Sequence, residues 1–571
     1  MKHRHKTYQR RNALMVFLLF AFALTAMIGR LCYLMIVRAD HYGVQAKEIQ
    51  QRERRIKAKR GEIRDRNGKV LAGNKAVSTI SVIHSQVKEP EKVIRILAKE
   101  LKMNEDQIRR KVEKVSSREK IKSNVDKKTS DTIRDYGLAG VTVDEDDKRQ
   151  YPYGSLGSKV LGFTGADNQG IIGLEVSYEK FLKGIDGAIL TTTTAGGVEI
   201  ENGAEERVEP VSGQNLTTSL DVTIMQYADQ VANQILQKKK AKSVDIIVMN
   251  PNNGEIYAMA CAPEFDLNSP FEITGDTASM TAKEKQDLRN QMWRNPCVSD
   301  TYEPGSTFKI LTSAAGIEKK VVTMNDHFFC PGYRIVEDRR IRCHKTTGHG
   351  SETFLQGIMN SCNPVFMDVG SRLGVHNFFE ELNQFQLMKR TGIDLPGEAA
   401  TIFHKEDKVG AVELATISFG QSFQISPVRL LASCSAIING GTSVTPHVGV
   451  STAREDGSYM KKFTYPGGSR VVSKETSDQI REALGKVVSE GTGKNAGVEG
   501  YEVGAKTGTS QKLPRGNGKY IASTLAFAPV SKPEVITLVR IDEPEGTYYG
   551  GTVAAPVVSQ LYTNLLPYIL K

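Results

Sequence analysis

The stretch TYEPGSTFKILTSAAG, residues 301–316, stands out from the charged, mixed sequence around it. The pair Pro304-Gly305 ends the preceding segment, and Ser306 and Lys309 then open a small, apolar run typical of a helix. Residues three apart at a helix start share a face, so the Ser306 hydroxyl and the Lys309 amine can meet. A lysine held away from water can accept a proton, and the free N–H groups of the first turn can stabilise an oxyanion. The stretch therefore predicts either a nucleophile beside its base or a capped helix with a solvated lysine.

Two later motifs decide between these interpretations, because Ser-x-x-Lys spacing alone is common. Further copies include those that begin at Ser85, Ser117 and Ser458, in polar or loop-like surroundings. The only Ser-x-Asn in the chain, 361–363, interrupts an apolar helical stretch, and the only Lys-Thr-Gly, 506–508, lies on a predicted strand. This ordered set is the motif set of serine β-lactamases and penicillin-binding proteins, so we favour the nucleophile.

The N-terminus predicts a membrane anchor. Residues 1–12 hold five Lys or Arg and no acidic residue, which is typical of a cytoplasmic basic tail. Residues 13–37 are apolar over more than the about 20 residues that cross a bilayer. A cleaved signal peptide is the alternative, but no small-x-small site follows the apolar core. Positive charge ahead of the span predicts that the N-terminus is inside and the rest of the chain outside. Arg30 either snorkels to the outer headgroups or contacts a partner helix.

The remainder of the chain divides into two regions of different composition. Residues 38–212 are polar and mixed, and we expect an extended pedestal domain, with a helix over 39–57. Residues 213–571 are richer in apolar residues and predict an α+β domain. A hairpin is expected at 243–260 and helices between 306 and 440, and the strands of the last 70 or so residues are expected to join the hairpin in one antiparallel sheet with helices packed on it.

The charge and the cysteines exclude some classes of protein. The net charge of +11 comes from basic residues interleaved with acids, and no nucleic-acid motif occurs, so we expect no nucleic-acid partner. The seven cysteines cannot all pair and include no CxxC. Cys330 and Cys343 bracket a turn-rich loop with His344 and His349 close behind, which leaves a disulfide, a metal site or two free thiols open. We assign no cofactor and no metal ligand from the sequence.

Several longer stretches resemble one family over essentially the whole chain. The chain looks like a class B penicillin-binding protein, a monofunctional peptidoglycan D,D-transpeptidase with one membrane anchor, and most like the division and sporulation branch. The stretches that carry the resemblance are RGEIRDRNGKVLA (60–72), RQYPYGSLGSKVLGFTG (149–165), GIIGLE (170–175), YEPGSTFK (302–309), TGIDLPGE (391–398), SFGQSFQISPVRLLASCSAIINGG (418–441) and KTGTSQK (506–512).

The resemblance implies roles for the catalytic residues. Ser306 would be the acylated nucleophile and Lys309 its base. Ser361 would relay protons to the leaving and entering amines. The backbone N–H groups of Ser306 and Thr509 would form the oxyanion hole.

The resemblance also implies how a substrate would be held. Asn363 would bind the substrate amide, and Lys506 and Thr507 would bind the terminal carboxylate, with Thr509 alongside. The small residues around Lys506, Gly508 among them, leave room for a peptide to lie as an added strand. The substrates would be D-Ala-D-Ala stem peptides and the inhibitors β-lactams, at the outer face of a bacterial cell membrane. A polytopic glycan polymerase and other wall-synthesis proteins are the implied partners.

Three alternatives were weighed against a transpeptidase. A hydrolase on the same fold needs a carboxylate that activates water, and Glu380 and Glu381 with Asn383 superficially resemble such a motif. Their amphipathic surroundings predict a solvated helix face instead. A sensor would need further membrane spans. A scaffold with a dead site would be expected to have lost one of the three motifs, and all are intact.

Overall fold

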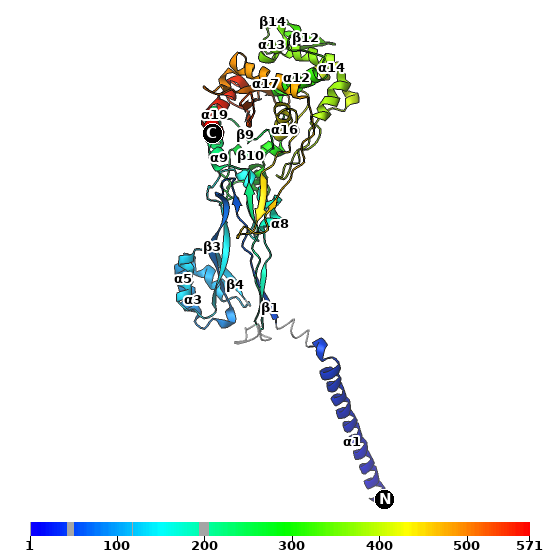
Figure 1. Cartoon of the computed structure of the whole chain (residues 1–571). Coiled ribbons are helices and arrows are strands. Elements are labelled where there is room, and N and C mark those ends of the chain that lie inside the picture. The colour runs from blue at the N-terminus through cyan, green and yellow to red at the C-terminus, as the bar shows by residue number, and fades with distance from the viewer. Residues whose placement is uncertain (1, 43–50, 117, 193–204, 571) are drawn as a thin grey trace. The chain divides into compact units, whose positions relative to one another are not determined.

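The computed structural model describes residues 2–42, 51–116, 118–192 and 205–570. The chain forms two compact units (Figure 1). The first comprises residues 1–59, 76–148 and 185–211, and the second comprises 60–75, 149–184 and 212–571. Two stretches of the expected pedestal thus belong to the unit that contains the C-terminal region. The domain boundaries expected from the sequence stay a prediction.

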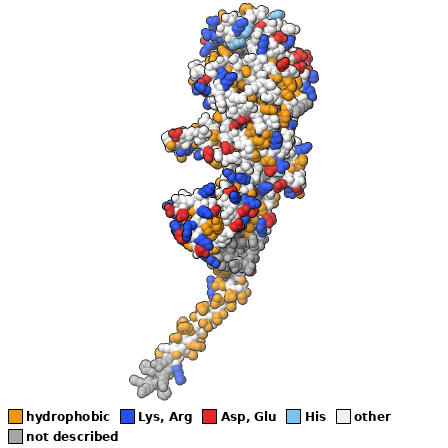
Figure 2. Space-filling view, turned by 90° about the vertical axis from the view of Figure 1, so that its left-hand side faces the viewer, with side chains coloured by type: hydrophobic (Ala, Val, Ile, Leu, Met, Phe, Trp, Pro, Cys, Tyr) orange, Lys and Arg blue, Asp and Glu red, His pale blue; other side chains and the backbone are white. Residues whose placement is uncertain are grey.

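An apolar helix begins the chain. Helix α1 (Lys2–Cys32) continues into a π-helical turn, η1 (Tyr33–Val37), and residues 10–37 are long and apolar enough to cross a membrane. Its large hydrophobic side chains are exposed, as Figure 2 shows along this helix. A helix that is apolar on all sides is stable when it is buried in a protein core or in a membrane. Because the side chains of α1 are exposed, the helix fits a single membrane anchor.

The rest of the first unit is a small α+β body with its own core. Helices α3 (Pro90–Leu101) and α4 (Glu105–Val112) bury one apolar face each, and Ile94 and Ile108 are fully buried there. Its other elements are β1 (Gln51–Ile56), η2 (His84–Gln86), β4 (Glu119–Val125), α5 (Lys127–Asp135), β5 (Val141–Gln150), β6 (Gly187–Thr192), β7 (Glu205–Val208) and part of β3 (Val70–Val82).

One local expectation in this unit is wrong. A helix was expected over residues 39–57; residues 39–42 are helical, but residues 51–56 form β1, which pairs antiparallel with β6. Residues 43–50 of that prediction lie outside the described residues. The pairing partner is more than 130 residues away in the sequence, so local helix propensity had no access to it.

The second unit holds the larger core. Its helices and strands are β2 (Ile63–Arg64), α6 (Ser158–Leu161), α7 (Gly173–Ser177), α8 (Glu179–Leu182), β8 (Asn215–Thr218), α9 (Val222–Lys239), β9 (Ser243–Met249), β10 (Ile256–Ala262), α10 (Ala282–Trp293), α11 (Pro296–Ser299), η3 (Gly305–Phe308), α12 (Lys309–Glu318), β11 (His327–Cys330), β12 (Tyr333–Val336), β13 (Arg339–Arg342), β14 (Gly350–Thr353), α13 (Phe354–Met359), α14 (Asn363–Gln384), η4 (Glu406–Lys408), α15 (Ala411–Ile417), α16 (Pro427–Ile438), β15 (Gly449–Ala453), β16 (Lys461–Lys462), α17 (Lys474–Ser489), η5 (Lys494–Ala496), β17 (Gly504–Gln511), β18 (Tyr520–Ala528), β19 (Val535–Asp542), α18 (Gly550–Val553) and α19 (Ala555–Ile569).

A five-stranded antiparallel sheet organises this unit. The strand order is β10-β9-β19-β18-β17, so the hairpin at 243–260 and the last three strands share one sheet, as the sequence predicts. Every residue of β10 and β19 is buried. Because alternate residues of a strand point to opposite faces, both faces of the sheet are covered. Helices α9 and α19 pack together on the sheet, and α16 and α17 contact β19 and β17. Strand β17 lies at the edge of the sheet.

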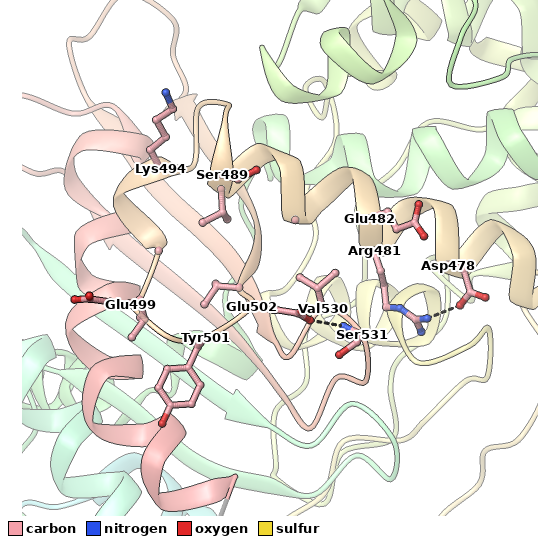
Figure 3. Close-up of a pocket in the computed structure, with 15 residues that line it drawn as sticks. Asp478, Arg481, Glu482, Ser489, Lys494, Glu499, Tyr501, Glu502, Val530 and Ser531 are labelled. Carbon is pink, nitrogen blue, oxygen red and sulfur yellow. Dashed lines mark hydrogen bonds and ion pairs between the residues drawn. The ribbon is translucent and has the colours of Figure 1, made fainter.

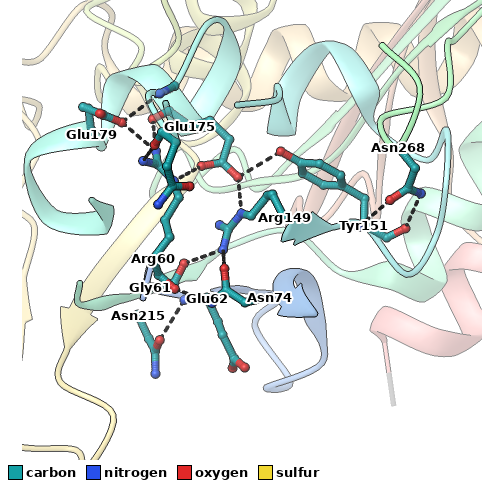
Figure 4. Close-up of polar contacts among 12 residues, drawn as sticks. Arg60, Gly61, Glu62, Asn74, Arg149, Tyr151, Glu175, Glu179, Asn215 and Asn268 are labelled. Carbon is teal, nitrogen blue, oxygen red and sulfur yellow. Dashed lines mark hydrogen bonds and ion pairs between the residues drawn. The ribbon is translucent and has the colours of Figure 1, made fainter. Parts of the chain in front are cut away.

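A buried ion cluster in the second unit joins residues of three of the family-like stretches (Figure 4). The Glu175 carboxylate accepts hydrogen bonds from Arg60 Nε at 2.6 Å and from Arg149 Nε at 2.7 Å, and all three side chains are at most 3% exposed. Arg60 also pairs with Glu179 at 2.7 Å, and Tyr151 donates its hydroxyl to Glu175 at 3.2 Å. Charges this deeply buried are tolerated only when each is paired. The cluster therefore ties residues 60, 149 and 175 into one local structure.

Candidate active site

The turn that carries Ser306, the predicted nucleophile, begins with the Pro304-Gly305 pair and is called the nucleophile turn below. Gly305 adopts the left-handed conformation (φ +58°), donates its N–H to Gly420 O at 2.9 Å, and opens the short helix η3. A Cβ on Gly305 would lie 3.0 Å from Thr509 O of the edge strand β17. Glycine at 305 thus lets the turn approach the strand, and it brings Ser306, which is half-buried, to the surface of a cleft beside β17.

Lys309 is fully buried one turn further along the chain. Its ammonium donates to Ser361 O and to Asn363 Oδ1, both at 2.7 Å, and more weakly to Ser361 Oγ at 3.4 Å. Among the described residues, no hydrogen bond joins Lys309 to the Ser306 hydroxyl, so the contact expected from the Ser-x-x-Lys spacing is absent from this state. Burial disfavours the charged amine and lowers the pKa of Lys309 to about 8. At neutral pH a fraction of the Lys309 side chains is therefore unprotonated.

Ser361 joins two lysines. It lies in the turn between α13 and α14 and adopts the left-handed conformation (φ +55°), which costs a non-glycine residue about 1–2 kcal/mol. Its Oγ accepts from Lys506 Nζ at 2.8 Å and from Lys309 Nζ at 3.4 Å. With both lysines donating, the Ser361 hydroxyl hydrogen is left to point elsewhere, toward the cleft that Ser361 lines.

Lys506 lies on the edge strand β17 and is completely buried. Burial, followed by the nearby charge of Lys309, holds the pKa of Lys506 well below its usual range. Gly508, two residues further along the strand, is also closely packed. A Cβ on Gly508 would lie 2.6 Å from Ser523 Oγ and 3.0 Å from Thr307 Cγ2. Glycine in the Lys-Thr-Gly motif therefore permits the strand to pass close to the nucleophile turn.

One cleft of about 470 Å³ collects the motif residues. Its lining contains Ser306, Ser361, Asn363, Thr507, Gly508 and Thr509. The two lysines lie buried beneath it. The structure thus brings all eight sequence-predicted site residues to one place, although 200 residues separate Ser306 from Lys506.

Several lining residues were not expected from the sequence. Phe419 and Gln421 come from the SFGQ stretch, which carried family resemblance but no chemical signal. Tyr549 and Gly550 come from a Tyr-Tyr-Gly-Gly run that carried none, and the Gly550 N–H donates to Thr509 Oγ1 at 3.0 Å. These residues shape the cleft rather than react, so their residue types gave no chemical signal in the sequence.

Glu303 is a further residue that the motifs did not reveal. Its buried carboxylate accepts from Arg515 Nη2 at 2.6 Å and from the Ser422 N–H at 3.0 Å. It precedes the nucleophile turn directly, so it ties that turn to the loop after β17 and to the SFGQ segment. A carboxylate three residues before the serine is the only sequence signal for this tie.

The acidic residues Glu380 and Glu381 lie away from the cleft on α14. Both pair with Lys319, at 2.6 Å and 3.4 Å. Glu380 is exposed, as expected for a solvated face, whereas Glu381 is buried, so that expectation is wrong for Glu381. The helix packs its Glu381 side against the core, which an amphipathic pattern alone did not indicate.

A second cavity, of about 890 Å³, lies along α17 and the segment that follows it (Figure 3). Its charged groups are held by neighbours: Arg481 pairs with Asp478, and the Glu502 carboxylate accepts from the Ser531 N–H at 3.3 Å. Its lining includes Ser489, but Lys309, Ser361 and Lys506 do not line it. The smaller cleft is therefore the candidate active site. Its polar residues would need no metal ion to act on a peptide.

Comparison with known proteins agrees with this geometry. Residues 245–563 match the Penicillin binding protein transpeptidase domain, and residues 55–218 match the Penicillin-binding Protein dimerisation domain. The chain is 38% identical to Stage V sporulation protein D of Bacillus subtilis, over 98% of this chain and 86% of that protein. It is 29% identical to the probable peptidoglycan D,D-transpeptidase PenA of Neisseria meningitidis serogroup A, over 95% of this chain and 91% of that protein.

The fold is also that of solved structures. A crystal structure of Penicillin Binding Protein 2X from Streptococcus thermophilus superposes with a TM-score of 0.75 at 23% identity, over 90% of this chain and 80% of that one. At that identity the likeness concerns the fold alone. Since the transpeptidase match covers more than half of the chain, and the dimerisation match lies ahead of it, the chain belongs to the penicillin-binding protein family with a dimerisation and a transpeptidase domain.

Proposed function

We propose that this chain is a peptidoglycan D,D-transpeptidase that cross-links stem peptides through an acyl-enzyme on Ser306, in wall synthesis at division or sporulation. The observation that carries the proposal is the placement of the Ser361 hydroxyl between two buried lysines, beside the cleft that Ser306 faces. The names of the relatives, a sporulation protein and a D,D-transpeptidase, support the same reaction class.

The first half-reaction acylates the serine. Lys309 in its neutral form takes the Ser306 proton, and the oxygen attacks the carbonyl of the penultimate D-Ala. Backbone N–H groups of Ser306 and Thr509 stabilise the oxyanion that forms. When the intermediate collapses, the peptide bond breaks and Ser361 delivers a proton to the departing D-Ala amine. Lys309 and Lys506 both donate to Ser361, so its hydroxyl is oriented for this transfer.

The second half-reaction transfers the acyl group. The amine of a neighbouring stem peptide attacks the ester carbon and passes its proton to Ser361, and the ester bond to Ser306 breaks as the serine regains its proton. The peptide lies along β17 as an added strand, because that strand forms the sheet edge. Asn363 holds the substrate amide, and Lys506 and Thr507 hold the terminal carboxylate.

The lining of the cleft favours transfer over hydrolysis. None of the described residues that line it is Asp or Glu, so no carboxylate is placed to activate water. Glu380 and Glu381, the candidates in the sequence, pair with Lys319 instead. A hydrolase of the β-lactamase type is therefore the weaker candidate function.

Penicillin labelling tests the assignment of the nucleophile. Fluorescent penicillin should label the membrane-bound chain, and Ser306→Ala should abolish the label. Ser313→Ala is the matched control, because Ser313 is a buried serine of α12 whose hydroxyl has no partner in the described chain. Labelling that persists in Ser306→Ala would refute the assignment. With a lipid-linked peptide substrate, cross-linked product supports transpeptidation, and free D-Ala alone supports hydrolysis.

The apolar helix α1 would place the cleft on the outer face of the cell membrane. The basic residues ahead of residues 13–37 favour an N-terminus inside. Protease added to intact spheroplasts should digest the C-terminal region and spare an N-terminal tag, and the reverse pattern would refute this orientation. The helix and the first unit would contact a polytopic glycan polymerase. Failure of such a polymerase to co-purify in mild detergent would count against that partner.

A further inference from the structure

A cluster of four metal-ligating side chains lies behind the cleft. Cys330, Cys343, Cys362 and His349 bring one ligand atom each into a group whose members all lie within 4.8 Å of one another. The three cysteines are buried, and the His349 side chain is 8% exposed. All seven cysteines of the chain are free thiols. The sequence left this loop open between a disulfide, a metal site and free thiols, and it did not associate Cys362 with it.

The spacing of these atoms fits a tetrahedral thiolate site. A zinc ion with Zn–S bonds of about 2.3 Å and a Zn–N bond of about 2.0 Å requires separations of about 3.8 Å between sulfurs and about 3.6 Å between sulfur and nitrogen. Cys343 Sγ and His349 Nδ1 lie 3.7 Å apart. A disulfide would join only two of the three thiols, and it would leave the third sulfur and the imidazole without a role.

The ligands come from four segments of the chain. Cys330 ends β11, Cys343 follows β13, His349 precedes β14, and Cys362 caps the start of α14. Strands β11 to β14 form two separate two-stranded sheets. They leave Phe329 and Ile335 exposed at 66% and 64%. A metal ion bound by all four ligands would add a cross-link between these segments.

A buried carboxylate lies beside the ligand cluster. Glu352 is 3% exposed, and its Oε1 lies 3.9 Å from His349 Nδ1. That oxygen has no hydrogen-bond partner in the described chain, while the other accepts from Asn360 at 2.9 Å. An unpartnered, buried carboxylate oxygen is costly unless positive charge lies nearby. Glu352 borders the ligand cluster, but it is not one of the four residues grouped there.

We propose that Cys330, Cys343, Cys362 and His349 bind one Zn²⁺ ion that fixes the wall of the active-site cleft. Binding releases the three thiol protons to water, so the ion, three thiolates and a neutral imidazole carry one net negative charge. Sulfur-rich, tetrahedral ligand sets select zinc over the harder magnesium or calcium. The ion is structural, because the protein fills all four ligand positions.

The consequence for the cleft rests on the proposed function. Cys362 stands between Ser361 and Asn363, so a metal–sulfur bond holds the left-handed turn that presents both side chains. The Asn363 side chain also donates to Arg342 O at 3.2 Å, immediately before Cys343. His344, immediately after Cys343, lines the cleft. Two of the four ligands are therefore directly attached to the cleft wall.

Metal analysis of the full-length chain, purified reduced in mild detergent, tests the site directly. We expect about one zinc per chain by mass spectrometry of the metal, and sulfur-to-metal charge-transfer absorption after replacement by Co²⁺. Cys343→Ser should lose most of the zinc. Cys434→Ala, which removes another fully buried thiol, in α16, should keep it. Absence of zinc from chain with free thiols, or a Cys330–Cys343 disulfide in the native protein, would overturn the proposal.

A second measurement covers the case in which Cys343→Ser fails to fold. A strong chelator added to the parent chain should lower the melting temperature and slow penicillin labelling, and added Zn²⁺ should restore both. An unchanged melting temperature after the zinc has been removed would refute the structural role. Zinc content is measured without labelling, so a chain that holds zinc but is not labelled would refute the proposed enzyme function and leave the metal site standing.

Discussion

The pH dependence of acylation should follow the ionisation of Lys309. Burial lowers the pKa of this lysine from 10.5 to about 8. The shift corresponds to about 3 kcal/mol of penalty on the charged form. At pH 7 about a tenth of the side chain is then neutral, against roughly 3 parts in 10,000 for an unshifted lysine. If neutral Lys309 is the base, burial raises the reactive fraction roughly 300-fold at that pH.

The assay is the second-order rate of acylation by a chromogenic β-lactam, measured in stopped flow from pH 6 to 9.5. The rate should rise about tenfold between pH 7 and pH 9, with a midpoint near the pKa of Lys309, which is about 8. Lys309→Arg should lower the rate by on the order of 10²–10⁴, because a guanidinium does not give up its proton in this range. A parent rate that is flat between pH 7 and pH 9 would refute Lys309 as the base.

The same ionisation links pH to stability. The folded pKa of Lys309, about 8, lies below the unfolded value of 10.5, so the unfolded chain binds more protons between these two values. The free energy of unfolding should therefore rise with pH across that window, by up to about 3 kcal/mol. Urea unfolding at pH 8 and pH 10 measures the rise. Lys309→Met should lose this increment, and an equal rise in that variant would assign it to other groups.

Substitutions at three further positions test separate parts of the structure. Glu175→Gln should lower the free energy of unfolding by roughly 3–5 kcal/mol in calorimetry, because it leaves the two buried guanidiniums of Figure 4 without a full counter-charge. Gly508→Ala should slow acylation by on the order of 10²-fold, because its Cβ would lie 2.6 Å from Ser523 Oγ and displace β17. Ser361→Gly should be about 1 kcal/mol more stable than Ser361→Ala, since only glycine relaxes the left-handed backbone, while both lose transpeptidation equally.

Each of these three predictions has a matched control or a result that would contradict it. Glu475→Gln, at an exposed position of α17, should leave stability nearly unchanged, and a loss as large as that of Glu175→Gln would remove the role of burial. Gly73→Ala places a Cβ no closer than 3.2 Å to its neighbours and should acylate like the parent. If Ser361→Gly cross-linked peptides while Ser361→Ala did not, the hydroxyl of Ser361 would be dispensable and only its backbone would matter.

The candidate site residues could be proposed from the sequence because each motif needs particular atoms at a fixed local spacing. Ser306 with Lys309, and Ser361 with Asn363, are such local pairs. Their union with Lys506 rests on tertiary structure: the last strands return to the hairpin and place β17 at the sheet edge. In the sequence, the order of the three motifs indicated that they meet in the fold. The resemblance to a family implied the roles of their residues.

Other features had no local signal. Residues 51–56 become a strand only because residues 187–192 pair with them. The four ligands of the proposed zinc site are spread over residues 330–362, without the short paired spacing by which such sites are recognised. Cys362 was seen only as the variable middle of Ser-x-Asn. In each case the partner lies far along the chain, where propensity and periodicity do not reach.

Two glycines set the distance between the nucleophile turn and the edge strand β17. A Cβ on Gly305 would press on Thr509 O, and one on Gly508 would press on Thr307 and Ser523. A Cβ would meet a backbone oxygen first at Gly305, and side chains together with Pro304 O at Gly508, so a side chain at either position would alter the separation of Ser306 from β17. An edge strand held in this way keeps its outward peptide groups available for an extended substrate. We therefore expect the proposed chemistry at Ser306 to depend on the protonation of the two buried lysines rather than on closure of the cleft.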